Sequence, residues 1–376
     1  MRIVRRITVV CLCLCMICGI RQILPGMHAK AAVSSDMAVP QFTYGVRTGS
    51  TAVLKWNMVE GADGYQIRMS SDKKFKEFKN RPIRYGEKTT TTITGIAEKG
   101  SIFYKMRAYK FDEDGKKIYS KWSGKLCMAA FDSTYEFAAN SKINSGYATV
   151  YYAYGTGKKK KTVCVNAGHG TKNGSSVSTL CHPDGSAKVT GGSTAAGSTY
   201  ATAVSGGTTL NDGSSEASVN LALALVLKDE LLKKGYNVLM IRQTDDVQLD
   251  NVARTVMANN LADCHIAIHY DSTKTDKGAF YIGVPNVSSY RNMYPVSKHY
   301  KEHDALGKAL IDGMKSAGVK IHGTGSMAID LTQTSYSTVP SVDLEVGDRA
   351  SDHSAGTHAK IAEGIAKGID NFFGTK

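Results

Sequence analysis

The ten residues KTVCVNAGHG, at positions 161–170, decide the fold of the second half of this 376-residue chain. A β-branched apolar run that ends in Gly168–His169–Gly170 predicts a buried strand followed at once by a tight turn. The strand would carry one imidazole at its carboxyl end, where open α/β sheets build their binding sites. His169 is therefore the first candidate site residue.

Two later segments supply partners of matching chemistry. Glu216 opens a long amphipathic run, and HIAIH at 265–269 predicts a second buried strand that ends in His269. His169, Glu216 and His269 make a set of two histidines and one carboxylate. In an exported hydrolase, such a set indicates a catalytic zinc ion (Zn2+) with one coordination position left open.

This half of the chain resembles the zinc-dependent N-acetylmuramoyl-L-alanine amidases of the amidase type 3 family, enzymes that trim bacterial peptidoglycan. Six segments carry the resemblance, in the family's order, over residues 162–376. They are the strand ending in AGHG, Glu216 at a helix start, IRQT at 241–244, Arg254 with Ala258–Asn259, the strand ending at His269, and residues 340–347 with their LEVG.

The resemblance implies roles for four residues. His169, Glu216 and His269 would bind zinc, and Glu345 would be the catalytic carboxylate. The implied reaction is hydrolysis of the amide between N-acetylmuramic acid and L-alanine of the stem peptide, with zinc polarising the carbonyl and lowering the pKa of water. Glu345 would take the water proton and pass it to the leaving amine.

The chain departs from the family pattern at three places. Asn166 replaces a usual aspartate, Tyr270–Asp271 replaces a small residue and asparagine, and GDRA at 347–350 replaces Gly–Phe–x–Ser. None of these changes removes one of the four residues above. We expect them, Asp348 included, to alter the rim of the site and with it the substrate preference.

Three other histidines could be mistaken for ligands. His265 shares a strand face with His269, but its place in the family pattern is apolar or aromatic, so we interpret it as structural. His299 and His303 stand four apart on a predicted helix and could share a face. No acidic third ligand accompanies them, which favours a solvated helix face.

The first 31 residues predict a secretory signal peptide. Basic residues at positions 2, 5 and 6 precede an apolar run at 7–20, and the small residues at 29 and 31 offer a cleavage site. The run is short for a membrane-spanning helix, so we expect a secreted, cell wall-associated protein. Four of the eight cysteines remain in the mature chain, without zinc-finger or redox spacing.

The formal net charge of +14 is unevenly placed. The leader carries +5, residues 32–130 carry +8, and residues 131–376 carry only +1. A basic exported domain favours anionic cell-wall polymers as partners beside peptidoglycan itself, with a partnerless lysine-rich surface as the open alternative. The compartment and the lack of a recognition motif disfavour nucleic acid.

Residues 32–130 show the alternation of an all-β sandwich, with strands around Leu54, Ile67 and Met106. They resemble a fibronectin type III domain through KW at 55–56, GADGY at 61–65, RAY at 107–109 and SKWS at 120–123. Ile102 replaces the corner tyrosine of that family. Such domains are usually spacers or weak binders, so we expect no catalysis here.

Residues 131–161 are interpreted as a linker, and residues 162–376 as the zinc amidase catalytic domain. Strands are expected at 163–166, 237–241, 265–269, 279–284 and 342–345, and helices at 216–234, 249–261, 297–317 and 356–373. This alternation predicts an α/β domain with a mostly parallel sheet covered by helices on both faces. A Gly/Ser/Thr-rich stretch at 171–215 interrupts it, is expected to be functional and could contain a hairpin.

Two other functions stay open. An amidase fold that has lost turnover could serve as an inactive or weakly active cell-wall binding protein, although the four intact site residues argue against this. A zinc peptidase could cut within the stem peptide, although the sequence has no His–Glu–x–x–His helix.

Overall fold

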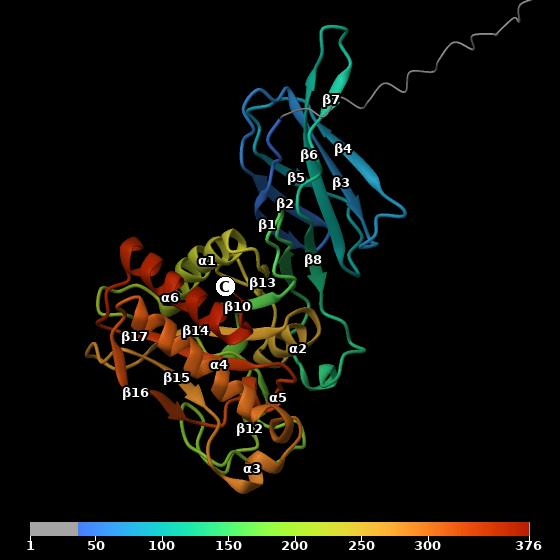
Figure 1. Ribbon diagram of the computed structural model, residues 1–376. Helices are drawn as coiled ribbons and strands as arrows, with labels where there is room; N and C mark the ends of the chain where they lie inside the picture. The colour runs from blue at the N-terminus through green and yellow to red at the C-terminus, as the bar shows by residue number, and fades with distance from the viewer. Residues whose placement is uncertain (1–36, 376) are drawn as a thin grey trace, which may run out of the picture. The chain divides into compact units, whose positions relative to one another are not determined.

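The computed structural model describes residues 37–375 of the chain (Figure 1). The predicted signal peptide, residues 1–31, lies outside the described residues. Between residues 37 and 375, no helix combines the length and the apolar character that crossing a membrane requires.

Residues 42–130 form an all-β part with two sheets, as the alternating pattern predicts. One sheet has the order β1–β2–β5, and the other has the order β8–β6–β3–β4 with β7 paired to β6. The strands are β1 (Phe42–Thr48), β2 (Thr51–Trp56), β3 (Gly64–Ser70), β4 (Lys79–Ile83), β5 (Thr90–Ile93), β6 (Ile102–Phe111), β7 (Lys117–Tyr119) and β8 (Leu126–Ala130). The core between the sheets contains the buried Trp56, whose ring packs edge-on against Tyr65 at 5.4 Å. Ile102 is buried at the start of β6.

The second half of the chain forms a sheet with the order β16–β15–β17–β14–β10–β13–β9. The strands are β9 (Tyr147–Tyr151), β10 (Thr162–Ala167), β13 (Asn237–Met240), β14 (Cys264–Asp271), β15 (Ala279–Gly283), β16 (Ile321–Ala328) and β17 (Ser341–Asp348). The four central strands are parallel, whereas β9 and β15 run antiparallel to their neighbours β13 and β17. The predicted mostly parallel α/β sheet is confirmed, with mixed edges.

Helices cover both faces of this sheet, as Figure 1 shows. The helices are α1 (Glu216–Lys233), α2 (Asn251–Leu261), α3 (Ser288–Asn292), α4 (Val296–Ser316), α5 (Thr332–Tyr336) and α6 (Ala355–Phe373). Alternation along β10 explains the two layers: Val163 and Val165 share a core with α1, α4 and α6, and Cys164 packs with Met257 of α2. The apolar run from Val163 to Val165 therefore fits the burial of this strand on both sides.

The predicted linker contains a strand. β9 pairs antiparallel with β8 on one side and with β13 on the other, so hydrogen bonding runs without a break between the two sheets. Residues 138–140 form a short 3-10 helix, and Ala138 packs in a small cluster with Val252 and Val256 of α2. Backbone pairing therefore holds β9 in place, and the burial of Ala138 holds residues 138–140.

Helices α4 and α6 cross at glycines. A Cβ atom on Gly313 of α4 would lie 2.4 Å from the Gly364 carbonyl oxygen and 2.5 Å from the Gly368 nitrogen of α6. A Cβ atom on Gly368 would lie 2.6 Å from the carbonyl oxygen of Ala309. The two backbones approach too closely for any side chain.

Gly368→Ala should therefore carry an overpacking penalty near the upper end of about 1–3 kcal/mol, because the clashing atoms are backbone atoms. After the gain of about 1 kcal/mol in helix propensity that alanine brings, the net destabilisation should be about 1–2 kcal/mol. Gly356→Ala, in the same helix, is the control, because its Cβ atom would meet only Ser354 Oγ at 4.0 Å. Urea unfolding of both variants is the measurement, and equal stability of the two would contradict the prediction.

Candidate metal centre

The predicted metal ligands lie where β10 and β14, two neighbouring parallel strands, end. His169 follows β10, His269 lies near the end of β14, and Glu216 is the first residue of α1. The Ser215 side chain caps this helix by accepting the amide hydrogen of Ser218, which fixes the helix start. Strand ends and a helix start thus bring the three residues together.

Three side-chain atoms converge on one point. His169 Nε2 and His269 Nδ1 each lie 2.9 Å from Glu216 Oε1, and the two nitrogens are 3.1 Å apart. Donor atoms around a tetrahedral zinc are about 3.3 Å apart, given bonds of about 2.0–2.1 Å. Two imidazole nitrogens and a carboxylate oxygen suit zinc, so the residues fit this ion. In the part of the chain that the structure describes, no other His, Cys, Asp and Glu side chains cluster in this way.

Hydrogen bonds and nearby charges set the tautomer and the protonation of these three side chains. His169 Nδ1 donates to the Ser205 carbonyl oxygen at 2.8 Å, which leaves Nε2 to bind a metal. Burial would raise the pKa of Glu216, but His169 and His269 hold it well below its usual range. Burial lowers the pKa of His269, yet nearby carboxylates, Asp343 first, raise it to about 10. Metal binding must displace that proton, so it weakens as pH falls.

The Gly–His–Gly turn sets the position of the His169 ring. His169 and Gly170 have φ angles of 62° and 72°, in the left-handed region. A Cβ atom on Gly168 would lie 2.2 Å from Cε1 of His269. Only glycine at position 168 lets the two histidine-bearing segments approach this closely.

Two buried arginines hold the carbonyl groups of this turn. Arg242 donates to the carbonyl oxygens of Ala167 at 3.0 Å and Gly168 at 2.8 Å, and Arg254 donates to that of His169 at 2.7 Å. Burial lowers the pKa of Arg242 to about 10 and that of Arg254 to about 9, so both remain charged at neutral pH. The IRQT and Arg254 segments of the sequence therefore act on the same turn.

Glu345 lies beside the cluster on β17. Glu345 lies directly opposite His269 in the register of β14 with β17. Its pKa is raised well above the usual range, first by burial and then by the charge of Asp343. Asp343 shares its strand face, and Asp343 Oδ2 lies 3.8 Å from His269 Nε2. Asp343 was not among the predicted site residues, although its place two residues before Glu345 is a signal that could have identified it.

Comparison with known proteins identifies the family. A family model described as N-acetylmuramoyl-L-alanine amidase (Amidase_3) matches residues 163–371, more than half of the chain. The chain belongs to this family. The predicted enzyme class, an N-acetylmuramoyl-L-alanine amidase, is thereby confirmed. No curated protein matches the chain.

Several solved structures of N-acetylmuramyl-L-alanine amidases match this chain over more than half of its length. Ami1 from Mycobacterium smegmatis is 20% identical, with a TM-score of 0.46 over 58% of this chain and 98% of that one. The apo form of Ami1 from Mycobacterium abscessus is 19% identical, with a TM-score of 0.45 over 57% and 99%. The amidase from Clostridium difficile 630 is 18% identical, with a TM-score of 0.41 over 57% and 98%.

The stretch at 171–215 of the amidase supports the centre. It contains a short 3-10 helix (Gly174–Ser176) and the antiparallel pair β11 (Ser178–Leu180) and β12 (Tyr200–Thr202). Its last part supplies the Ser205 carbonyl to His169 and the Thr208 amide to Glu216 Oε2, at 2.8 Å each. These contacts come from backbone atoms, so residue types gave no signal of them.

A buried carboxylate docks this stretch on the amidase. Asp330 is 1% exposed and lies 3.1 Å from His182 Nε2 and 3.1 Å from Lys188 Nζ. The amides of Val189 and Thr190 also donate to it, at 2.6 and 3.1 Å. Burial would raise the pKa of Asp330, but these donors hold it well below its usual range.

Asn166, Tyr270, Gly347 and Asp348, which belong to the three departures from the family pattern, are buried, whereas Asp271 and Arg349 are half-buried and Ala350 is exposed. Asn166 contacts His265 Nε2 at 3.2 Å behind the site. The Tyr270 amide donates to Glu216 Oε1 at 3.3 Å, and Asp348 accepts two backbone amides that precede β15. The side chains of Asn166 and Asp348 thus make interior hydrogen bonds, which explains why polar residues are tolerated there.

The other histidines lie outside the cluster. His265 is fully buried, and burial and then Arg254 lower its pKa to about 3. The expectation of a solvated face is wrong for His303, which is buried and accepts the Ser341 amide at Nδ1, because this side of α4 packs on β17. His299 lies 2.9 Å from Glu302 on the exposed side.

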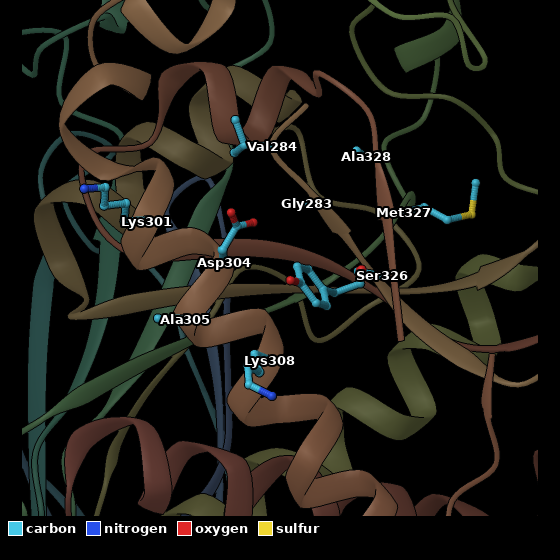
Figure 2. Close-up of a pocket in the computed structure, with 10 residues that line it drawn as sticks. Gly283, Val284, Lys301, Asp304, Ala305, Lys308, Ser326, Met327 and Ala328 are labelled. Carbon is cyan, nitrogen blue, oxygen red and sulfur yellow. The ribbon is translucent and has the colours of Figure 1, made fainter. Parts of the chain in front are cut away.

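A separate hollow of about 480 Å³ lies between α4 and strands β15 and β16. Figure 2 shows the Asp304 carboxylate projecting from the helix, with Ser326 on the strand across this space. Because β15 runs antiparallel to β17, Gly283 lies at the sheet edge opposite the metal centre. The hollow contains none of the candidate catalytic residues.

Asp330→Asn should destabilise the amidase by about 3–5 kcal/mol near neutral pH, because it leaves Lys188 buried without a counter-charge. Since the pKa of Asp330 is lowered by folding, its contribution is present above the usual carboxyl range and is lost as pH falls below it. The difference in unfolding free energy between wild type and variant should therefore shrink between about pH 5 and pH 2. Urea unfolding with chelator present measures it, and a difference that stays constant with pH would contradict the assignment.

Proposed function

We propose that this amidase is a secreted, zinc-dependent peptidoglycan hydrolase that cleaves the amide between N-acetylmuramic acid and L-alanine of the stem peptide. The observation that carries the proposal is the convergence of His169 Nε2, Glu216 Oε1 and His269 Nδ1 within 3.1 Å of one another, beside Glu345. Family membership supplies the class of scissile bond.

His169, Glu216 and His269 would hold the zinc, which when bound polarises the scissile carbonyl and lowers the pKa of water. Glu345 takes the proton of the attacking water on Oε2, an atom without a hydrogen-bond partner among residues 37–375. Burial and Asp343 raise the pKa of Glu345 in the metal-free protein, which suits the return of that proton to the leaving nitrogen of L-alanine. The ionised form of Glu345, which takes the proton first, would be favoured by the positive charge of a bound zinc. Asp343 faces His269 Nε2 and so favours the tautomer whose Nδ1 is free to bind metal.

The remaining parts of the chain receive supporting roles in this proposal. Residues 1–31 act as a signal peptide, residues 32–130 form a fibronectin type III-like domain, and residues 131–161 link it to the catalytic domain at 162–376. The protein is associated with the cell wall, and the +8 charge of residues 32–130 attracts anionic wall polymers.

Mass spectrometry of digested peptidoglycan tests the proposed activity. Products with free L-alanine amino termini are expected. Other new termini would instead indicate a peptidase that cuts within the stem peptide, and the absence of products would indicate a binding protein without turnover.

The purified mature protein should carry about one zinc per chain, because three protein ligands leave one open position. His169→Ala, Glu216→Ala and His269→Ala should each reduce this occupancy, as measured by elemental analysis. His299→Ala is the control and should keep the zinc, since His299 pairs with Glu302 on an exposed helix face. Full zinc occupancy in all three ligand variants would show that the metal binds at another site.

Glu345→Gln should reduce hydrolysis by about 10²–10⁴-fold while zinc content and unfolding temperature stay close to wild type. Glutamine has nearly the same shape but cannot accept the water proton. A peptidoglycan-release assay beside a melting curve is the measurement. If Glu345 were only structural, the variant would lose stability and keep its turnover when folded, and a zinc-loaded, folded and fully active variant refutes the catalytic role.

A further inference from the structure

The outward face of the sheet formed by β3, β6 and β8 carries an unusual set of side chains. Tyr65 and Ile67 of β3, with Tyr104 and Met106 of β6, point into the core and are buried. Because side chains alternate along a strand, the residues between them point outward. They include Arg68 on β3 and Lys105 and Arg107 on β6; together with Lys125, next to β8, we call these four residues the cationic face.

Aromatic rings separate the cations of this face. The Arg68 guanidinium carbon lies 3.6 Å from the ring centroid of Phe78 and 4.7 Å from that of Trp122. The Arg107 guanidinium carbon lies 4.5 Å from Trp122. Lys105 Nζ lies 4.8 Å from the same ring. Trp122 thus stands among three positive charges.

The face lacks counter-charge. Arg68 and Lys105 are directly opposed in the register of β3 with β6, an arrangement of like charges that destabilises a sheet. Each arginine Nε donates to a neutral side chain, Arg68 to Asn80 at 3.0 Å and Arg107 to Gln66 at 2.9 Å. All ion pairs of the described residues join groups at position 159 or beyond, so none lies in residues 37–130.

The electrostatic strain is also seen in one titrating group. Burial, and then the charges of Arg68, Lys125 and Arg107, lower the pKa of Lys105. Stacking on aromatic rings accounts for the geometry, since each cation–π contact contributes about 0.5–1 kcal/mol at an exposed site. The four cations contact four rings, those of Phe75, Phe78, Tyr119 and Trp122. Stacking does not neutralise their charge, and no ion pair within residues 37–130 does so.

We propose that the cationic face binds a phosphodiester-linked anionic polymer of the cell wall. Guanidinium groups match phosphate oxygens in geometry, and stacking fixes their planes before the ligand arrives, which reduces the ordering cost of binding. A repeating phosphate would complete the charge balance along the row from Arg68 to Arg107. This inference rests on the proposed export and identifies the surface that recognises the wall.

The test compares two triple variants of the full mature protein with the same change in net charge. Arg68→Gln/Lys105→Gln/Arg107→Gln removes the face, and Lys55→Gln/Lys88→Gln/Lys99→Gln removes three exposed lysines elsewhere in residues 37–130. Retention is measured on purified walls that carry phosphodiester polymers and on the same walls after hydrofluoric acid has removed them. Both variants also carry Glu345→Gln, so that the walls are not digested.

The face variant should lose about tenfold or more of its retention on the untreated walls at low salt, and the control variant much less. On the stripped walls the two variants should bind alike. Equal losses of retention in both variants would show that net charge alone explains the binding. A loss of retention that persists on stripped walls would show that the face binds another ligand. Either result overturns the proposal.

Lys105→Gln alone separates binding from folding. It removes the like charge opposite Arg68, so the unfolding temperature should stay constant or rise while wall retention falls. A purely structural face predicts the reverse, a lower unfolding temperature with unchanged retention. Hydrolysis of a soluble muropeptide by the same substitution, made with native Glu345, should equal that of the otherwise native protein. Failure of the proposed amidase activity would appear in that assay alone and not in wall retention.

Discussion

Two buried guanidinium groups hold the turn that carries His169, and the rest of the centre depends on this contact. A turn with left-handed residues leaves its carbonyl oxygens without strand partners, and buried carbonyls need donors. Arg242 and Arg254 provide several fixed donors each, which a lysine could not do. The amidase thus places two buried positive charges against the backbone of one turn. These contacts fix the turn and, with it, the position of His169 relative to Glu216.

Much of this arrangement could be predicted from the sequence because it depends on local patterns. Short apolar runs gave the strands around Val163 and Ile266, and amphipathic spacing gave α1, α2, α4 and α6 within a few residues of their ends. The order of the Gly–His–Gly, Glu216, His269 and Glu345 segments gave the residues that the fold brings together. For the strands, the helices and the three candidate metal ligands, residue type and position were the signal, whereas Glu345 was identified through the family resemblance.

The rest could not be predicted, because it depends on contacts between distant segments. β16 has two glycines at positive φ and no apolar alternation, so nothing local marks it as a strand. β9 is set by pairing with two partners, and the support from Ser205 and Thr208 comes from backbone atoms that any residue has. The buried place of Asn166 follows from its contacts with His265 and Arg254, whose positions only the tertiary fold determines.

The docking of residues 171–215 on Asp330 has a consequence for when the enzyme becomes active. Lys188 and Asp330 are 142 residues apart, and His169 and His269 are 100 residues apart. Contacts of such long sequence separation close late, since the loop entropy must be overcome before they form. A nascent chain that has emerged only as far as position 300 holds the three candidate metal ligands but lacks Asp330 and Glu345. In the proposed mechanism, activity therefore requires nearly the whole chain to have emerged and folded.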